Sequence, residues 1–356
     1  MKKSWFMLLA AILVIGALLT ACGTAKNNAT GGKGGKDKSF KVGMVTDTGG
    51  VNDKSFNQSA WEGLQKFGKD FNLTKNTDFK YLQSTSASDY EPNLNQLVHQ
   101  NYNLIFGIGF LMQDAVKNVA EQNKNAHFAI VDTVVNAPNV VSINFNEAEG
   151  SFLAGVVAGS MTKTGKVGFV GGVKSELIKK FENGFKAGVK TVNPKAEIFA
   201  QYTGNFEAAD KGQAIAATFY GKGADIVYHA AGAAGNGVFT EAKTRKKAGK
   251  NVWVIGVDRD QYDAGLPEDV TLTSMVKRVD RAVYDVSKQA KDGDFPGGKT
   301  LQFGLKDKGV GLSDHTDHIT QDVLKKVDDF KKKIVDGDIT PPKTDKEYQD
   351  YLKTLK

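Results

Sequence analysis

The stretch Val45-Thr-Asp-Thr-Gly-Gly-Val-Asn-Asp-Lys-Ser-Phe-Asn57 lies between two apolar patterns of different period. The run before it, residues 40–45, is typical of a short buried strand, and apolar residues recur at helical spacing from Phe56 to Phe67. The loop between strand and helix carries two glycines, two aspartates and an asparagine. In an open α/β sheet such a loop borders the crevice where ligands bind. The stretch therefore predicts either a ligand-binding βα unit or an ordinary turn built from the same residue types.

Strand-like and helix-like runs alternate through the rest of the chain, which is typical of βαβ units and of parallel sheets covered on both faces. The roughly 315 residues after the N-terminal segment are too many for one ordinary core, and they suit two lobes. Two sets of five strands are expected, at 40–47, 79–84, 103–110, 127–133 and 140–146, and at 166–171, 197–203, 225–231, 252–258 and 271–276. Helices are expected near 57–70, 90–101, 112–123, 147–162, 175–191, 207–220, 235–248, 280–291 and 320–336, and the last fourteen residues are left open between a short surface helix and no structure.

The N-terminus predicts an exported chain. Lys2 and Lys3 precede an apolar run from Trp5 to Leu19, which is short for a membrane span and typical of a signal peptide. Leu19-Thr-Ala-Cys22 resembles a lipobox, and Cys22 is the only cysteine in the chain. We therefore expect a lipoprotein signal peptide at 1–21 and lipidation of Cys22. A plain signal peptide with a chance cysteine and an uncleaved anchor are the alternatives.

Residues 22–38 are expected to form a flexible tether from the lipidated cysteine, because they contain no aromatic residue and are rich in glycine and lysine. Cleavage before Cys22 removes Lys2 and Lys3 and no acidic residue, so the formal charge falls from +7 to +5. The lysines are scattered among acidic residues and no nucleic-acid motif is present. We interpret the basic balance as a means of solubility near an anionic envelope, and we expect no nucleic-acid partner.

Enzyme signatures are missing from the sequence. It contains no G-x-x-x-x-G-K-[ST], G-x-S-x-G, H-E-x-x-H or C-x-x-C, so we expect neither an enzyme nor a cofactor. Asp314-His-Thr-Asp-His318 has spacing that could suit a metal, but a solvated surface loop is the favoured interpretation. His229 lies on the apolar run 226–230, and a core or strand-end histidine is favoured over a functional one.

Several expected strand ends carry the same residue types as the first loop, at 107–110, 131–133, 202–206, 231–236 and 256–260. Together with Thr273-Ser-Met-Val-Lys277 they resemble the basic-membrane-protein family of bacterial lipoproteins, whose best-understood members are purine-nucleoside receptors of ABC transporters. The D-x-G-G-x-x-D-x-S-F-N loop, the F-x-x-G-F-x-x-G run at Phe181–Gly188 and the G-V-D strand end are the most specific parts of this resemblance, which covers the whole mature chain. It implies an α/β type I periplasmic-binding-protein fold, in which two doubly wound parallel-sheet lobes are joined by three crossovers with a ligand cleft between them.

The same resemblance implies that the two lobes exchange segments. The N-terminal lobe is expected at 39–148 and 262–300, and the C-terminal lobe at 149–261 and 301–340, with a C-terminal tail at 341–356. The helix at 147–162 would carry the chain into the second lobe, and a crossing near 260–275 would bring it back.

Ligand roles follow from the resemblance position by position. Phe56 and Phe206 would sandwich a purine from opposite lobes, and Asp132 would accept a hydrogen bond from an N–H of the base. The ribose hydroxyls would be held by Asp47, Asn52, Asp258 and Lys277. The first helix would be capped by Ser55 or Asn57, or by Asp53; Asn57 and Asp53 also count among the expected ligand residues, and Gly232 would let backbone approach the sugar. Each has a structural alternative: Phe56 as a helix staple, Phe206 as a loop anchor, Asp258 as a turn former.

The resemblance implies a substrate-binding lipoprotein of an ABC importer. It would capture purine nucleosides such as guanosine, adenosine or inosine by lobe closure and deliver them to membrane permease subunits. We expect a monomer, anchored by its lipid on the extracytoplasmic face of a Gram-positive cell membrane. A receptor for a sugar or other small metabolite in the same cleft is the alternative, followed by a surface adhesin and a nucleoside hydrolase.

Overall fold

The structure, a computed structural model, describes residues 40–355. Residues 39–356 form one compact unit that contains both sheets described below, with their cores. The expected signal peptide, Cys22 and the tether lie outside the described residues. None of the helices in residues 40–355 has the length and apolar character needed to cross a membrane.

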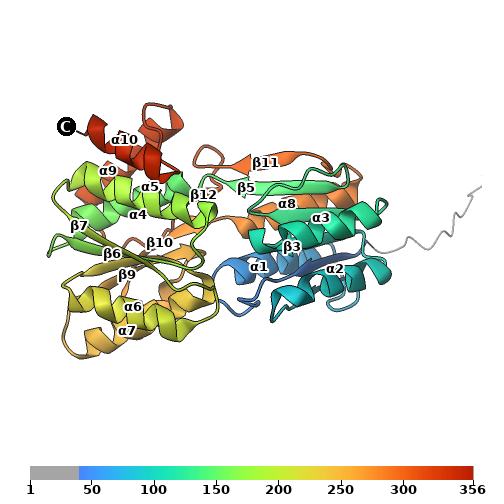
Figure 1. Ribbon diagram of the computed structural model, residues 1–356, viewed down its shortest axis with the longest axis horizontal. Helices are drawn as coiled ribbons and strands as arrows, with labels where there is room; N and C mark the ends of the chain where they lie inside the picture. Colours follow the sequence, from blue (N-terminus) through green and yellow to red (C-terminus); the bar gives the residue numbers. More distant parts are fainter. Residues whose placement is uncertain (1–39, 356) are drawn as a thin grey trace, which may run out of the picture. The chain divides into compact units, whose positions relative to one another are not determined.

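The first sheet contains six parallel strands in the order β11-β5-β4-β3-β1-β2. Helix α1 pairs with α8 on one face of this sheet, and α2 pairs with α3 on the other (Figure 1). The strands are β1 (Val42–Val45), β2 (Phe79–Leu82), β3 (Leu104–Ile108), β4 (His127–Val131), β5 (Val140–Phe145) and β11 (Thr300–Phe303). The helices are α1 (Phe56–Asp70), α2 (Tyr90–His99), α3 (Gln113–Gln122) and α8 (Val279–Asp292), with short 3₁₀ turns η1 (Ala87–Asp89) and η2 (Phe110–Met112).

The second sheet has the order β12-β10-β9-β8-β6-β7, and only β12 runs antiparallel to its neighbour. The two parallel-dominated sheets confirm the expected α/β fold. The strands are β6 (Lys166–Gly171), β7 (Glu197–Tyr202), β8 (Ile226–Ala230), β9 (Trp253–Asp258), β10 (Thr271–Lys277) and β12 (Val310–Leu312). The helices are α4 (Glu147–Met161), α5 (Glu176–Val192), α6 (Ala209–Gly221), α7 (Asn236–Lys247), α9 (Gln321–Val335) and α10 (Asp345–Thr354), with 3₁₀ turns η3 (Gly232–Gly235) and η4 (Tyr262–Gly265).

Three crossings join the lobes, after β5, after β10 and between β11 and β12. The first crossing, into α4, is the one predicted. The return was predicted near residues 260–275 and that prediction is wrong, because β10 pairs with β9 in the second sheet, so the chain returns only after Lys277. Likewise β11 belongs to the first sheet up to Phe303. The other lobe boundaries given above stay predictions.

All ten expected strands are present, but β11 and β12 were not predicted. Both are short edge strands of three or four residues, and β11 alternates between exposed and half-buried positions. Such short segments with few buried residues give little apolar pattern in the sequence. The C-terminal tail, which was left open, forms α10, whose start is fixed by a capping box between Thr344 and Glu347.

Helix α4 is buried around nearly its whole circumference, and glycines let it approach α5 closely. A methyl group added at Gly155 would lie 2.1 Å from the carbonyl oxygen of Phe185, and one at Gly188 would lie 2.0 Å from that of Phe152. The F-x-x-G-F-x-x-G run is therefore a helix-packing motif, with its glycines turned toward α4.

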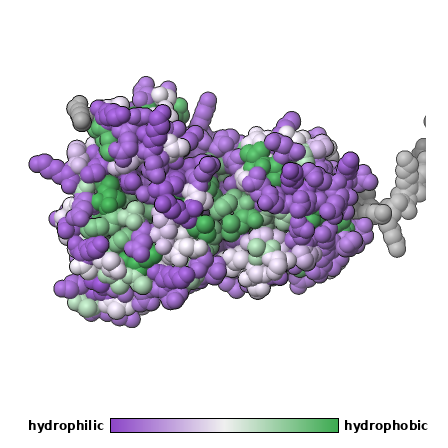
Figure 2. All heavy atoms as spheres, viewed as in Figure 1, coloured by the Kyte–Doolittle hydropathy of each residue, from purple (hydrophilic) through white to green (hydrophobic). Residues whose placement is uncertain are grey.

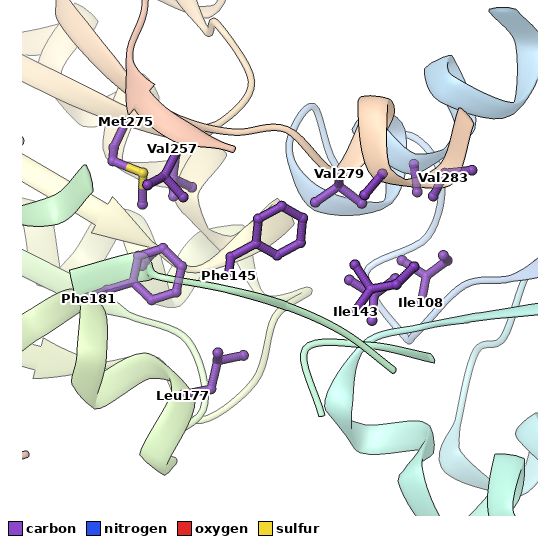
Figure 3. Packing of buried hydrophobic residues seen from close by; sticks show 14 of the residues in the cluster. Ile108, Ile143, Phe145, Leu177, Phe181, Val257, Met275, Val279 and Val283 are labelled. Carbon is purple, nitrogen blue, oxygen red and sulfur yellow. The ribbon is translucent and has the colours of Figure 1, made fainter. Parts of the chain in front are cut away.

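One apolar cluster extends through both lobes. Phe145, at the end of β5, lies between Phe181 and Val257 of the second lobe and Val279 and Val283 of α8 in the first (Figure 3). The crossing after β5 is thus packed into a core that the two lobes share.

Candidate functional site

A cleft between the lobes collects the carboxyl ends of strands from both sheets. It encloses about 490 Å³ of space free of atoms, part of it open to solvent. Figure 2 shows hydrophobic residues in the middle of the visible face, between the two lobes, where much of the surrounding surface is hydrophilic. The lining residues are Asp47, Gly49, Asp53, Phe56, Asn57, Gly109, Phe110, Asp132, Leu177, Ile178, Phe181, Phe206, Ala230, Gly232, Val257, Asp258 and Lys277.

All the predicted ligand residues except Asn52 line this cleft. Asn52 is exposed and is not among the lining residues. It was singled out because asparagine and aspartate in a Gly-rich loop look alike in sequence. The turn that follows Gly50 buries Asp53 and leaves Asn52 in solvent.

The loop after β1 is fixed by Asp53, which caps helix α1. Its carboxylate accepts hydrogen bonds from the backbone N–H groups of Ser55, Asn57 and Gln58, at 2.8, 2.8 and 3.1 Å. Ser55 occupies the N-cap position, but its side chain makes no capping bond. The predicted cap by Ser55 or Asn57 is therefore wrong, and the alternative, Asp53, is confirmed. Because Asp53 already binds the N–H groups at the start of α1, the side chain of Asn57 is not needed as a cap and donates to Asp47.

Asp47 presents one carboxylate oxygen to the cleft. Its Oδ1 accepts from the side-chain amide of Asn57 at 2.7 Å and from the N–H of Gly49 at 2.9 Å. Its Oδ2 lies next to Gly109, 3.3 Å from where a β-carbon would be. Burial raises the pKa of Asp47 to about 7; the hydrogen bond from Asn57 opposes this shift, and the nearby Asp53 adds to it.

Aromatic rings from both lobes line the same cleft as Asp47. Phe56, from α1, lies against Gly109, and Phe206, from the loop after β7, lies over Gly172. Phe110 meets Phe206 edge-to-face across the cleft, with ring centroids 6.2 Å apart. A methyl group at Gly172 would lie 2.2 Å from the Phe206 ring, so the glycine is what allows this ring position.

A second group of residues is charged. The Nζ of Lys277 lies 2.6 Å from Asp132 Oδ2 and 3.9 Å from Asp258 Oδ1, and all three side chains are at least nine-tenths buried. The ammonium also lies 4.7 Å from the ring centroid of Phe56. The Phe56 ring therefore lies near both the charged group and Gly109, which is next to Asp47. Asp132 Oδ1 is buried without a hydrogen-bond partner in the described structure.

Backbone geometry holds both aspartates of this group at strand ends. Asp132 follows β4 with a φ of 70°, and Asp258 ends β9 with a φ of 67°. Residues other than glycine adopt this left-handed conformation at a cost of order 1–3 kcal/mol, although aspartate and asparagine tolerate it better than most residues. The two aspartates thus share one backbone conformation at matching strand ends of the two lobes.

The protonation of the charged group is set by burial and by its own members. Burial lowers the pKa of Lys277, but Asp132, Asp258 and Glu147 outweigh burial and raise it above the usual value, so the ammonium is charged. Burial raises the pKa of Asp258 to about 6, against the effect of Lys277 and the hydrogen bond from Ser55. Glu147, at the start of α4, has its pKa raised to about 7 by burial, with Lys277 opposing the shift.

Asp132 was expected at the base and Asp47 at the ribose. The structure joins Asp132 to Lys277 and Asp258, whereas Asp47 binds Asn57 and the N–H of Gly49 and lies next to Gly109. The roles of both aspartates toward a ligand stay predictions.

Several lining residues were not predicted. Gly109 and Phe110 end a strand that was noted for its glycines, so the sequence pattern could have found them. Leu177, Ile178 and Phe181 lie in the first turns of α5, where their spacing is that of an ordinary core helix. Nothing local distinguishes those three from packing residues.

Hydrogen bonds and ion pairs join the lobes across the cleft, so the described structure is closed. At the rim, Thr48 Oγ1 donates to Glu207 at 2.9 Å, and Arg259 pairs with Glu62 at 2.6 Å. Deeper, Ser55 Oγ donates to Asp258 at 2.5 Å, beside the Asp132–Lys277 pair.

The histidines lie apart from the cleft lining. His315 pairs with Asp260 and stacks on Tyr262, whereas His318 pairs with Asp269. The two histidines of the 314–318 segment thus turn to different partners. Residues 40–355 contain no group of three or more side chains placed to hold a metal ion.

Comparison with known proteins gives the chain a family. Residues 40–345 match the family model described as ABC transporter substrate-binding protein PnrA-like. The CD4+ T-cell-stimulating antigen of Listeria innocua is 54% identical over 96% of this chain and 99% of its own. The ABC transporter nucleoside-binding protein BmpA of Lactococcus lactis is 44% identical over 96% and 99%. Basic membrane protein A of Borreliella burgdorferi is 35% identical over 88% and 91%.

A solved structure with the same architecture is an ABC transporter solute-binding protein from Aeropyrum pernix. It superimposes with a TM-score of 0.78 at 27% identity, covering 89% of this chain and 97% of that one. The fold and the family resemblance expected from the sequence are therefore confirmed.

Proposed function

The chain belongs to the PnrA-like family of ABC transporter substrate-binding proteins, and from that premise we propose that its cleft captures purine nucleosides. The observation that carries this proposal is the division of one cleft into an aromatic part with a single carboxylate and a charged part with two carboxylates and an ammonium. A nucleoside has the same two parts, a flat base with polar edges and a sugar rich in hydroxyls. A relative 44% identical carries the name of a nucleoside-binding protein.

The aromatic part would hold the base. Phe56 and Phe206 belong to opposite lobes, so a ring between them is stacked only when the lobes are closed, and an offset stack adds roughly 0.5–1.5 kcal/mol beyond burial. Asp47 Oδ2 is free to accept from an N–H of the base edge, while Asn57 holds the other oxygen. This assigns the base to Asp47 in place of Asp132.

The charged part would hold the ribose. Asp132 Oδ1 lacks a partner, and a sugar hydroxyl is a donor of the right kind for it. Asp258 and Lys277 would complete the contacts to neighbouring hydroxyls. Gly232, with a φ of 55°, lies beside Phe206 and would let backbone approach the ligand there. A buried carboxylate left without its hydroxyl costs about 1–3 kcal/mol, which would penalise free bases relative to nucleosides.

Binding would capture the ligand by lobe closure and do no chemistry on it. The residues above come from both lobes, so the ligand makes its full set of contacts only in the closed form and shifts the equilibrium toward it. Membrane permease subunits would then recognise the closed form. Lipidation of Cys22 would keep the monomeric receptor on the extracytoplasmic face of the membrane.

A sugar is the second candidate ligand. The Asp132–Lys277–Asp258 group would suit sugar hydroxyls without any base, and aromatic rings also stack on sugar faces. Asp47 distinguishes the candidates, because a carboxylate paired with an amide between aromatic rings suits the edge of a base.

Two isosteric variants test the division of the site. Asp47→Asn should weaken guanosine and guanine alike, by roughly tenfold or more. Asp258→Asn should weaken guanosine and leave any binding of guanine unchanged, because the free base lacks the sugar. Calorimetric titration of both variants with both ligands measures this. Equal losses for the two ligands in Asp258→Asn would contradict the ribose assignment.

A further inference from the structure

Two side-chain amides of the second lobe grip the backbone of the loop that precedes α1. Asn236 Nδ2 donates to the carbonyl oxygen of Asp53 at 3.1 Å, and Gln261 Nε2 donates to that of Lys54 at 2.9 Å. Neither amide lines the ligand cleft. The contacts join the lobes on consecutive residues of the loop that carries Asp47 and Phe56. They require only protein atoms.

The orientation of Gln261 is fixed by the second lobe itself. Its side-chain oxygen accepts from the N–H of Val257 at 2.8 Å, so the amide nitrogen has to face the first lobe. Its own N–H donates to Ser274 Oγ at 3.0 Å, and its side chain is almost completely buried. The donor aimed at Lys54 is therefore preorganised before the lobes meet.

His229 supports this orientation from behind. Its Nε2 lies 2.9 Å from the same oxygen of Gln261, and since that oxygen accepts from Val257, Nε2 has to be the protonated nitrogen. The other ring nitrogen, Nδ1, is buried without a partner next to Gly235, where a methyl group would lie 2.0 Å away. Burial lowers the pKa of His229 to about 4, so the ring is neutral at physiological pH. Gly235 leaves room for the ring, and the ring holds Gln261 in place.

The Gln261 contact is made to a residue with a strained backbone, Lys54. Its φ of 59° is a left-handed conformation that a lysine adopts at a cost of order 1–3 kcal/mol. The neighbouring side chain of Ser55 makes the next contact, to Asp258. Residues 53–55 thus meet the second lobe three times in succession, whereas the rim contacts of Glu62 and Thr48 involve exposed or half-buried side chains.

We propose that Asn236 and Gln261, with His229 as a positioning residue, form a clamp on residues 53–54 that sets how readily the lobes close without ligand. A receptor that is closed only part of the time binds each ligand more weakly in proportion to the closed fraction. The clamp therefore scales the affinity for every ligand by one factor, and it does not discriminate among ligands. Its effect on affinity rests on the proposed function, but its effect on closure does not.

The test is a distance measurement between the lobes. The compact unit 39–356 contains no cysteine, so Asp114→Cys and Asp210→Cys, at exposed positions in the first turns of α3 and α6, give one spin label on each lobe. Pulsed electron resonance on the ligand-free protein then reports the closed and open populations. Asn236→Ala and Gln261→Glu should each move the population toward longer distances. Asn93→Ala is the matched control, because its amide donates to a carbonyl of its own lobe, at Gln83.

Rescue tests the part played by His229. His229→Leu removes the Nε2 donor and should lengthen the inter-lobe distance, whereas His229→Gln, whose amide reaches the same place, should restore the wild-type distribution. A purely structural role would lower the melting temperature in both variants without separating them by distance.

Affinity gives the second measurement. Asn236→Ala should weaken guanosine and inosine by the same factor, roughly three- to tenfold for one lost hydrogen bond. Unchanged distances in Asn236→Ala and Gln261→Glu would overturn the clamp, and so would losses that differ between ligands. A distance shift in a protein that binds no nucleoside would support the clamp and contradict the proposed function, so the two failures are distinguishable.

Discussion

Asp47 changes its protonation state near physiological pH. Burial raises its pKa to about 7, and the groups nearest to it that carry charge, Asp53 and Glu207, are both acidic. Tyr90 is also close enough for Asp47 to raise the tyrosine's pKa. An N–H donor on a base edge prefers the carboxylate over the carboxylic acid. The affinity for such a base should therefore depend on pH.

We predict that guanosine and inosine bind more tightly as pH rises through about 7, because the ligand then meets an ionised Asp47. In the unliganded protein, ionisation of Asp47 has the opposite effect, because it lowers stability. The native state keeps a proton that the unfolded chain loses above about pH 4, so its contribution to stability falls as pH rises toward 7. Calorimetric titrations between pH 5 and 8 measure the binding effect. Asp47→Asn should reduce the dependence near 7 and keep whatever part Glu147 contributes near 7 and Asp258 near 6; an unchanged profile in this variant would contradict the assignment.

Stacking is tested at Phe206, which lies over Gly172 and is half-buried. We predict that Phe206→Ala weakens nucleoside binding at least tenfold, about 1.4 kcal/mol, with little change in the melting temperature. Phe199→Ala is a control of equal size on the same strand-to-loop segment, since that ring stacks on Phe219 of α6, away from the cleft. Unchanged affinity in Phe206→Ala would remove the stacking claim.

At the scale of single residues, the sequence is informative where a side chain's chemistry and its strand-end position agree. Asp47, Asp132 and Asp258 follow or end apolar strands, and each of them lines the cleft. Asn52 has similar chemistry but lies in solvent. The sequence does not reveal this, because no periodicity records the turn that buries Asp53 and exposes Asn52. The ion pair between Asp132 and Lys277 could not be predicted from the sequence either, since it joins residues of different lobes.

Among the secondary-structure elements, α4 and α5 approach each other closely through glycines on both helices. We predict that Gly188→Ala lowers the free energy of unfolding by about 2 kcal/mol or more, because its methyl group would lie 2.0 Å from the carbonyl oxygen of Phe152. Gly221→Ala, at the end of α6, is the control, since nothing lies within 4 Å of an added methyl group there. Urea denaturation of both variants measures the difference, and equal stabilities would contradict this interpretation of the glycine run.

Whole elements were predictable where the hydrophobic period ran long enough. Most strands from β1 to β10 are buried on both faces and read as short continuous apolar runs, and most helices between them show a period of 3.6. Edge strands β11 and β12 are short and contain few buried residues, so no apolar run marks them in the sequence. The position of the return crossing depends on which neighbour β10 pairs with, and pairing is a property of the assembled sheet.

For the molecule as a whole, the shared core predicts cooperative unfolding. The larger apolar cluster runs through both lobes by way of Phe145, and a smaller cluster under α6 and α7 belongs to the second lobe alone. We predict a single calorimetric transition for residues 39–356, shifted upward as a unit by ligand; at a hundred times the dissociation constant the stabilisation is about 2.7 kcal/mol. Two transitions, of which only one responds to ligand, would contradict a shared core.

The most direct test of capture is a calorimetric titration of the 39–356 unit after unfolding and refolding, which removes any ligand that co-purifies. Guanosine, inosine, adenosine, cytidine, ribose and galactose would be titrated in turn. The two-part site predicts tight binding of the purine nucleosides, with ribose and galactose producing no heat of binding. Silence from every nucleoside, or binding of ribose or galactose as tight as that of guanosine, would contradict it.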